Sequence, residues 1–525
     1  ESDFLYRDIC FYDYHSRLIS MDKPQDSKKI VHSNNYMSFW VKYESFDNGK
    51  LDVQAIDRYF DVLINPREKY KNADRVMYDF IYQQIGDVDT QQLESNRKWI
   101  KENIFQLDKT ELNLQKKKYL KIFFEDDRDT YIREEKRYVM TKIYNKNDYN
   151  IEINNNVYGL PNDNLGLNSK KPYLEHKTRK LPVPNLIDVK QVLLQRKFFD
   201  FLANKANAGL TNVFFENESR EITAYPNGEF EKGDFSGYFL QIQKGKSVLI
   251  KYQDTIVDYR YNLQKNFVLK KILNWTPNKN STQSNNVYEN YYDTYTDKNK
   301  IFTVLDDVLF FKCLKRNLFN DVEDIMVDNP CIKRNIIMSR DIIFAWIYKG
   351  QKNGAQNVIK NVGIDIIKNS INAGYMGKAV LQFNMLASFE EYFGGEDMKN
   401  KYSEIRSSIK TKINSNDYQV CESDDEYLYA AGQLIRYFVS LSKIKDKAHS
   451  LANPFLSCTD SKQLAKKLEH YFKKYNYNYK VSDKRSNKLY TLVSNYEYDK
   501  KIDTTMVIAG YISDNLVYES DKEEN

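Results

Sequence analysis

The chain has 525 residues, 41% of them hydrophobic and 29% charged, with a formal net charge of +6 at pH 7. This length exceeds what one hydrophobic core usually organises, so we expect two to four domains. The composition is that of a globular protein. Because no run of about 18 apolar residues occurs, we expect no membrane-spanning helix.

The cysteines and the first residues of the chain bear on its compartment. The five cysteines are far apart and never form a CxxC pair. This pattern argues against a disulfide framework and against a structural zinc site. The opening residues, ESDFLYRDIC, are charged and mixed, unlike a secretory signal. We therefore expect a cytoplasmic protein.

Residues 1–150 have a mixed pattern with much helix. Apolar residues recur at helical spacing over residues 51–63, which predicts a helix that ends before Pro66. Residues 136–143 alternate in polarity and are predicted to form a strand. Residues 145–185 are irregular and rich in Asn, Gly and Pro. Residues 191–207 predict a second amphipathic helix, and Gly209 suits its exit.

The middle of the chain favours strands. Residues 211–260 contain β-rich runs separated by turn signals, which predicts antiparallel strands. Two dipeptides, Asn227-Gly228 and Lys244-Gly245, are typical of hairpin turns. Residues 276–300 are strongly polar and are predicted to form a loop.

From about residue 301 the pattern is helical almost throughout. Ser423 and Glu426 have the spacing of a capping box before one of these helices. Helices are predicted over residues 379–393, 403–413, 427–442, 462–475 and 488–498. The predicted fold class is α+β: a mixed region over residues 1–375 that contains the antiparallel strands, followed by a helical bundle over residues 376–525.

The segment 462–475, KQLAKKLEHYFKKY, has two separate faces when it is drawn as a helix. Its apolar residues fall within about 100° of the circumference, and lysines fill the opposite arc. Residues 462–488 hold nine Lys or Arg against two acidic residues, so the positive charge of the chain is concentrated here. Such a face is typical of a polyanion binder, although a solvated face of an ordinary bundle helix has the same pattern.

A second basic cluster spans residues 170–197, where eight Lys or Arg stand against Glu175 and Asp188. It begins in the irregular segment beside several asparagines. Asn can read adenine and Lys or Arg can read guanine through base edges, while the remaining cations can bind phosphates. A flexible charged loop without a ligand is the alternative interpretation.

Catalytic chemistry is weakly indicated. None of the five histidines lies in HExxH, HxH or HD, and the chain has no Walker loop, Rossmann fingerprint or GxSxG. The segment 394–397, GGED, resembles the metal-binding turn of palm-type polymerases, but that turn needs a strand hairpin and its flanks here predict helices. The acidic residues at 125–129 are more typical of an exposed turn. We therefore expect no catalytic residue, metal or cofactor.

Several phrases, taken in order, resemble the large subunit of type I-B CRISPR surveillance complexes, known as Cascade. They are HSNNYMSFWVK at 32–42, the basic segment 162–188, YLYAAGQLIRYF and its continuation at 427–477, NKLYTLVSNYEY at 487–498 and MVIAGYISDNLVYE at 506–519. None of these phrases is catalytic. The resemblance covers most of the chain.

This resemblance implies a non-catalytic DNA-recognition subunit in antiviral defence. A guide RNA reads the target strand by pairing, and a protein subunit reads a short flanking motif, the PAM, and helps to open the duplex. The implied partners are the guide RNA (crRNA), a double-stranded DNA target, the backbone, handle-binding and small subunits of the complex, and a helicase–nuclease effector. Residues 1–375 would recognise the PAM and the guide handle. The bundle over 376–525, which resembles a small subunit, would stabilise the displaced strand.

The two basic clusters then become candidate sites. Candidate PAM or handle contacts are Asn162, Asn164, Asn168, Lys170, Lys171, His176, Lys177, Arg179 and Lys180. Candidate displaced-strand contacts are Arg436, Lys443, Lys462, Lys466, Lys467, Lys473, Lys474, Lys484, Arg485 and Lys488. Tyr475, Tyr477 and Tyr479 could supply stacking platforms, or else form an edge of the bundle.

Two other functions stay open at this point. One is a metal-dependent nuclease or palm-type nucleotidyl enzyme that uses Glu396 and Asp397, or the acidic residues at 125–129. The other is a scaffold protein whose basic patches have no specific ligand.

Overall fold

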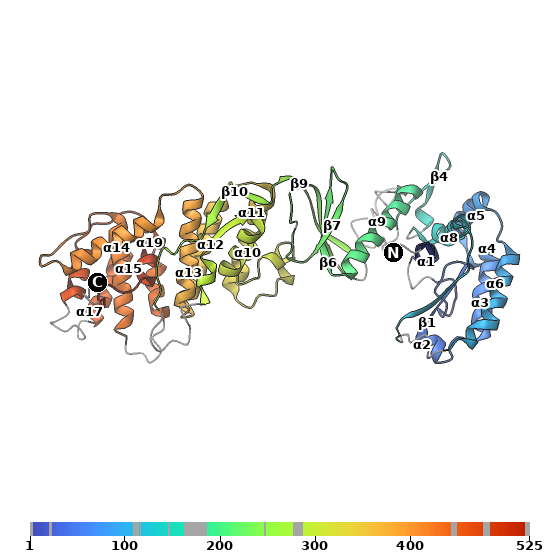
Figure 1. Ribbon diagram of the computed structural model, residues 1–525, viewed down its shortest axis with the longest axis horizontal. Coiled ribbons are helices and arrows are strands. Elements are labelled where there is room, and N and C mark those ends of the chain that lie inside the picture. The colour runs from blue at the N-terminus through green and yellow to red at the C-terminus, as the bar shows by residue number, and fades with distance from the viewer. Residues whose placement is uncertain are drawn as a thin grey trace. The chain divides into compact units, whose positions relative to one another are not determined.

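The computed structural model describes residues 4–19, 24–108, 115, 117–144, 147–161, 186–230, 232–245, 248–276, 287–442, 449–475 and 484–519. The chain divides into two compact units (Figure 1). The first comprises residues 1–207 with 244–249, and the second comprises residues 208–243 with 250–525. Antiparallel sheets occur in the N-terminal half and the C-terminal region is helical, so the α+β fold class is confirmed.

The first unit is built of helices and two small antiparallel sheets, one with the order β1-β2 and one with the order β3-β4-β5. Its strands are β1 (Ser38–Lys42), β2 (Tyr119–Phe123), β3 (Ile151–Ile153), β4 (Asn156–Gly159) and β5 (Ile187–Asp188). Its helices are α1 (Phe4–Ser16), α2 (Tyr43–Asp47), α3 (Val53–Ile64), α4 (Pro66–Lys69), α5 (Asn72–Ile85), α6 (Thr90–Asn103), α8 (Arg128–Lys142) and α9 (Val189–Asn207).

Two of the helices predicted in this unit are confirmed. In α3 the side chain of Asp52 accepts a hydrogen bond from the backbone N–H of Ala55 at 2.6 Å, which caps the helix. The buried face of α3 is the one that the apolar spacing predicts, apart from Val53, which is exposed. Helix α9 covers the predicted residues 191–207, and Gly209 follows it with φ of +80°.

The strand predicted over residues 136–143 is wrong, because these residues belong to helix α8. Asp127 caps the helix by accepting a hydrogen bond from Thr130 N–H at 2.7 Å. The helix packs against both α1 and α5, so side chains around much of its circumference are buried, including Glu134, Arg137 and Tyr138. A helix that is covered on two sides has no continuous polar face, so its sequence lacks the usual helical pattern. The remaining alternation of polar and apolar residues is equally typical of a strand.

The second unit opens with the predicted antiparallel strands, which form a four-stranded sheet in the order β7-β6-β8-β9. Its strands are β6 (Leu210–Glu216), β7 (Ile222–Pro226), β8 (Phe235–Gln243) and β9 (Leu249–Tyr259). A second, two-stranded sheet pairs β10 (Asn262–Val268) with β11 (Thr294–Asp297). The loop predicted over 276–300 is therefore partly wrong, since its described end contains β11 and the start of a helix.

The predicted role of Asn227-Gly228 is also wrong. Gly228 does adopt a turn conformation, with φ of +84°, but β7 and β8 are not neighbours. Both strands pair with β6, which lies between them. The turn ends β7 and starts a crossing connection rather than closing a two-residue hairpin. Lys244-Gly245, in contrast, lies between the neighbouring strands β8 and β9.

The rest of the second unit is helical, as predicted. Its helices are α10 (Lys298–Leu309), α11 (Pro330–Lys349), α12 (Ala355–Asn372), α13 (Met376–Tyr392), α14 (Met398–Asn414), α15 (Asp424–Ser440), α16 (Asn453–Leu456), α17 (Ser461–Tyr475), α18 (Lys484–Ser494) and α19 (Thr504–Ile512). Ser423 caps α15 by accepting a hydrogen bond from Glu426 N–H at 3.2 Å, which is one half of the predicted capping box. In place of the other half, the Glu426 carboxylate accepts from Glu422 N–H at 2.6 Å.

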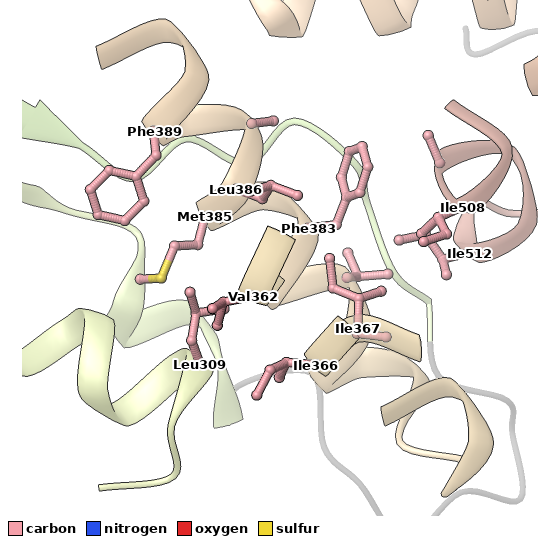
Figure 2. Packing of buried hydrophobic residues seen from close by; sticks show 14 of the residues in the cluster. Leu309, Val362, Ile366, Ile367, Phe383, Met385, Leu386, Phe389, Ile508 and Ile512 are labelled. Carbon is pink, nitrogen blue, oxygen red and sulfur yellow. The ribbon is translucent and has the colours of Figure 1, made fainter. Parts of the chain in front are cut away.

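Helix α13 is buried along almost its whole length and is central to this unit (Figure 2). Its buried polar side chains form hydrogen bonds with the backbone of residues earlier in the chain. Asn384 accepts from Leu273 N–H at 2.8 Å and donates to Leu273 O at 2.9 Å. Gln382 donates to Val308 O at 3.0 Å. The boundary predicted at residue 375 falls between α12 and α13, which pack against each other within one compact unit.

Helices α15 and α19 cross at a contact made by two glycines. A Cβ at Gly432 would lie 2.2 Å from Val507 O, and a Cβ at Gly510 would lie 2.1 Å from Tyr429 O. No other residue permits this approach, because both positions face backbone that cannot move aside. The crossing fixes the C-terminal helices against one another and so positions the basic surface described next.

Candidate nucleic-acid interface

The rotation of α17 about its axis is fixed by the burial of its apolar face. The side chain of Asp460 caps the helix, accepting from Gln463 N–H at 3.0 Å. Leu464 and Leu468 are fully buried. Tyr471 packs on Phe455 of α16 with ring centroids 4.7 Å apart. A separate contact stacks Phe472 on Tyr490 of α18, with centroids 3.6 Å apart and ring planes within 11°.

The opposite face of α17 presents four exposed lysines: Lys462, Lys466, Lys473 and Lys474. Within the part of the chain that the structure describes, Lys462 and Lys466 make no hydrogen bond or ion pair. Lys473 pairs with Glu469 at 2.5 Å, one helical turn away. Lys474 lies over the rings of Tyr471 and Tyr475, 5.2 and 5.5 Å from their centroids. This face is available to a ligand that carries negative charge.

Three other candidate cations are held by protein groups. Lys467 donates to Pro454 O at 2.6 Å, which ties α17 to α16. Arg485 and Lys488, both in α18, donate to the backbone carbonyls of Glu519 and Ser415. Each of these side chains bends back onto the bundle, and all three are only partly exposed. Lys484 begins α18, but its side chain lies outside the described residues, as does Lys443.

Of the two interpretations of Tyr475, its burial favours a place in the bundle over a stacking platform. Its ring is buried in the bundle and lies stacked on Phe438, with centroids 6.4 Å apart. A base could not reach it without opening the core. Tyr477 and Tyr479 lie outside the described residues.

The candidate PAM or handle residues, Asn162 to Lys180, all lie in the segment 162–185, outside the described residues. The part of that basic cluster that is described divides into two kinds. Lys190 and Lys197 are exposed on α9, whereas Arg196 is buried. Arg196 donates to Glu135 Oε1 at 2.6 Å and its guanidinium lies 5.4 Å from the centroid of the Tyr14 ring. Arg196 therefore joins α9 to α8 and α1 and is not available for nucleic acid.

Arg436 belongs to a partly buried polar group beneath the surface. Its guanidinium lies 5.6 Å from the centroid of the Tyr511 ring, and its Nη1 is 3.3 Å from His449 Nδ1. The hydroxyl of Tyr511 is 2.8 Å from the same nitrogen. Because a guanidinium can only donate, Nδ1 of His449 must be an acceptor, and the imidazole is neutral. Burial, together with the charge of Arg436, lowers the pKa of His449 to about 4.

This arrangement predicts a stability loss in mild acid. Between its ordinary pKa of about 6.5 and the folded value of about 4, the unfolded chain binds a proton that folded His449 does not. Stability therefore rises with pH through this window and falls on acidification. We expect the wild type to lose about 2 kcal/mol more than His449→Gln between pH 7 and pH 4.5. Urea unfolding at the two pH values measures this, and an identical pH response in both proteins would contradict it.

The two acidic residues of the segment 394–397 are engaged in a helix cap and in an ion pair. Asp397 caps α14, accepting from the N–H groups of Lys399 and Asn400 at 3.1 and 3.2 Å. Glu396 pairs with Lys401 at 2.7 Å. The segment 394–397 joins two helices, so the strand hairpin of a palm-type site is absent there. Among the described residues, no three His, Cys, Asp or Glu side chains gather in a way that could hold a metal ion.

Sequence reasoning missed one group of cations. Arg406 and Lys410, one turn apart on α14, lie beside α18 and contact Glu519. Their i, i+4 spacing in the sequence could have identified them, since it places two cations on one face of a helix. Nothing in the sequence indicates that the C-terminal segment returns to this face, because that contact joins residues more than 100 positions apart.

No protein-family model, curated protein or solved structure matches the chain. Of the helices that the structure describes, none has the combination of length and apolar surface that a bilayer crossing requires.

Proposed function

We propose that this chain is the large, non-catalytic subunit of an RNA-guided DNA surveillance complex of the type I-B CRISPR class. In this proposal its helical bundle stabilises the displaced DNA strand, and residues 1–375 recognise the PAM-flanked duplex beside the handle of the guide RNA. The other subunits and a helicase–nuclease are its partners. The observation that carries the proposal is the exposed lysine face of α17.

The ligand of this face would be single-stranded DNA. A displaced strand presents one phosphate per nucleotide, and proteins that bind it use a cationic surface that follows the backbone. Lys462, Lys466 and Lys473 recur on one side of a helix whose other side is locked in the bundle. Because the helix backbone is already fixed, only the lysine side chains lose conformational freedom on binding. The PAM, the guide RNA and the effector are included in the proposal because the sequence resemblance implies them.

The test is binding of the guide-loaded complex to duplexes with randomised flanks, with and without this subunit. We expect flank-dependent binding only when the subunit is present. One wrong base pair in the flank should cost about 1–3 kcal/mol, as for other sequence-specific DNA contacts. Binding that ignores the flank, or a chain that never joins the complex, would refute the proposal.

A further inference from the structure

Two aromatic rings border the exposed lysines of α17. At about 100° per residue, Lys462, Lys466 and Lys473 fall within about 40° of one another and form a lysine row. Phe472 lies about 80° round the helix from Lys462. There it stacks on Tyr490 of α18, with ring centroids 3.6 Å apart and ring planes within 11°. Both rings are partly exposed, so an aromatic surface adjoins the lysine row.

The Tyr490 hydroxyl lies close to charged groups of α17. Burial and the carboxylate of Glu469 raise the pKa of Tyr490, whereas the ammonium of Lys473 acts in the opposite direction. Glu469 and Lys473 are themselves paired at 2.5 Å, one helical turn apart. Because the effect of a charge falls off with distance, Tyr490 and Lys473 are neighbours across the contact between α18 and α17. A ligand that Lys473 binds would therefore meet the Tyr490 ring.

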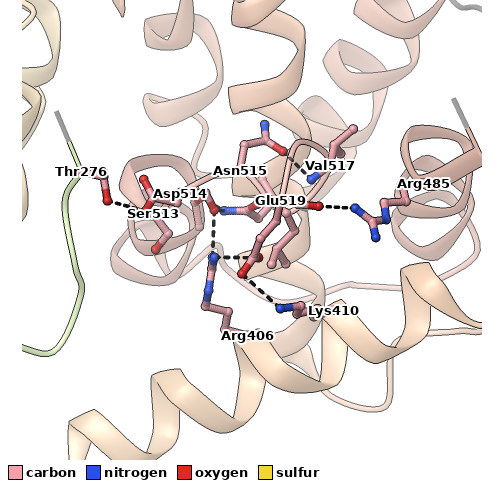
Figure 3. A network of polar contacts seen from close by, with 12 residues as sticks. Thr276, Arg406, Lys410, Arg485, Ser513, Asp514, Asn515, Val517 and Glu519 are labelled. Atoms are coloured by element: carbon pink, nitrogen blue, oxygen red, sulfur yellow. Dashed lines mark hydrogen bonds and ion pairs between the residues drawn. The ribbon is translucent and has the colours of Figure 1, made fainter. Parts of the chain in front are cut away.

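Helix α18 is fixed to the rest of the bundle. Arg485, in its first turn, donates to the backbone carbonyl of Glu519, as Figure 3 shows, and Lys488 donates to that of Ser415. The helix also packs against both α14 and α15. Tyr490 is thus held beside the lysine row before any ligand arrives, and this preorganisation reduces the conformational freedom that binding would cost.

A row of cations beside an aromatic ring is the combination that proteins use for single-stranded nucleic acid. Cations bind the phosphates of the strand, and unpaired bases stack on aromatic side chains. A duplex cannot use such a ring without unstacking its own bases. Tyr475, which the sequence suggested as a platform, is buried in the bundle, whereas Tyr490 is partly exposed.

We propose that Tyr490, supported by Phe472, is the platform on which a base of the bound single strand stacks, while Lys473 binds the adjoining phosphate. The inference rests on the proposed function, because it adds a base contact to the same strand-binding surface. It gives the two helices different tasks, with phosphate binding by α17 and base stacking by α18. This surface should therefore prefer an unpaired strand to a duplex.

The test uses the full chain with Tyr490→Leu, which keeps an apolar side chain and removes the ring. Its binding to a fluorescent oligothymidylate is compared with its binding to an oligomer of equal length that carries the sugar–phosphate backbone without bases. We expect the affinity for oligothymidylate to fall about 5- to 20-fold and the affinity for the abasic oligomer to stay within about twofold. The salt dependence should not change, because no phosphate contact is lost. Tyr490→Phe, which keeps the ring, should bind both ligands like the wild type.

The matched control is Tyr496→Leu. Tyr496 also stacks on another ring, that of Tyr427, with centroids 5.3 Å apart, but its hydroxyl donates to the carboxylate of Asp424 at 2.9 Å. This control should change both affinities less than about twofold. An equal loss for both ligands in Tyr490→Leu would show that the ring acts through the structure of the bundle, and that result would overturn the inference.

A second measurement needs no variant. An oligothymidylate with one thymine replaced by iodouracil is irradiated on the wild-type chain, and the crosslinked residue is identified by mass spectrometry. A stacked base should crosslink to Tyr490, whereas crosslinks found only at other residues would overturn the inference. Wild-type affinity in Tyr490→Leu, with binding that still depends on Lys462 and Lys466, would overturn it and leave the proposed function standing. A wild-type chain that binds neither oligomer would overturn both this inference and the assignment of the α17 face.

Discussion

Lys462→Glu combined with Lys466→Glu should weaken binding of single-stranded DNA by about 30- to 100-fold at about 0.1 M salt. Both lysines are exposed on the free face of α17, and neither is engaged by the described part of the protein. Each phosphate contact on a single strand contributes about 0.7 to the slope of log K against log salt, so the slope should fall by about 1.4. Fluorescence titrations at several salt concentrations give both quantities.

The control for this prediction is Lys352→Glu with Lys399→Glu, which makes the same change of charge at two other exposed lysines of the second unit. A general electrostatic effect would weaken both double variants equally, and that result would contradict the assignment of the α17 face. Both variants should unfold within about 0.5 kcal/mol of the wild type, because exposed substitutions rarely cost more. Lys467 is left unchanged because it donates to Pro454 O. Its substitution would disturb the contact between α17 and α16, so weaker binding could then reflect a change of structure.

The α17 face shows where sequence reasoning succeeds. A helical period is a local property, so the spacing of Leu464 and Leu468 is enough to predict which lysines point to solvent. The structure confirms the buried face for these two residues. The same reasoning failed for α8, because that helix is covered on two sides and keeps a buried Glu134–Arg137 pair. In such a helix, the polarity of a residue does not indicate whether it faces solvent.

Contacts between distant residues account for the remaining failures. The turn at Asn227-Gly228 was recognised, but strand order is a nonlocal property, and β6 lies between the strands that the turn was expected to join. In the candidate interface, the sequence identifies Lys488 and Arg485 as cations. It does not reveal that their long side chains reach carbonyls at residues 415 and 519. Charge can be predicted from sequence, whereas the partner of a charge depends on the fold.

The bundle also contains a buried charged pair whose disruption should be costly. Glu426, in the first turn of α15, and Lys412, near the end of α14, are both buried, and Lys412 Nζ lies 2.8 Å from each carboxylate oxygen. Ser408 Oγ donates to Glu426 at 2.6 Å, and Glu422 N–H donates to it at 2.6 Å. Burial alone would raise the pKa of Glu426, but these hydrogen bonds and the ammonium outweigh it and lower the pKa.

Glu426→Ala should therefore reduce the free energy of unfolding by about 3–5 kcal/mol, because it leaves the ammonium of Lys412 buried without its main partner. Exposed Glu422, 3.3 Å from Lys412, can recover part of the loss. Chemical denaturation followed by circular dichroism measures the change. Since the folded pKa of Glu426 is lowered, the wild-type advantage is complete above the unfolded value of about 4.3 and is lost as the pH falls through the folded value.

Two comparisons test whether the loss of stability in Glu426→Ala comes from the burial of the charges or from the loss of the ion pair. Glu469→Ala breaks an exposed pair with Lys473 on α17 and should leave the stability nearly unchanged, because solvent screens such a pair. Lys412→Met combined with Glu426→Leu removes both charges and should cost far less than Glu426→Ala, because no charge is left uncompensated. If the double variant is as unstable as the single one, the carboxylate acts mainly through Ser408 and the Glu422 backbone. The Lys412–Glu426 pair would then be a minor part of what joins α14 to α15.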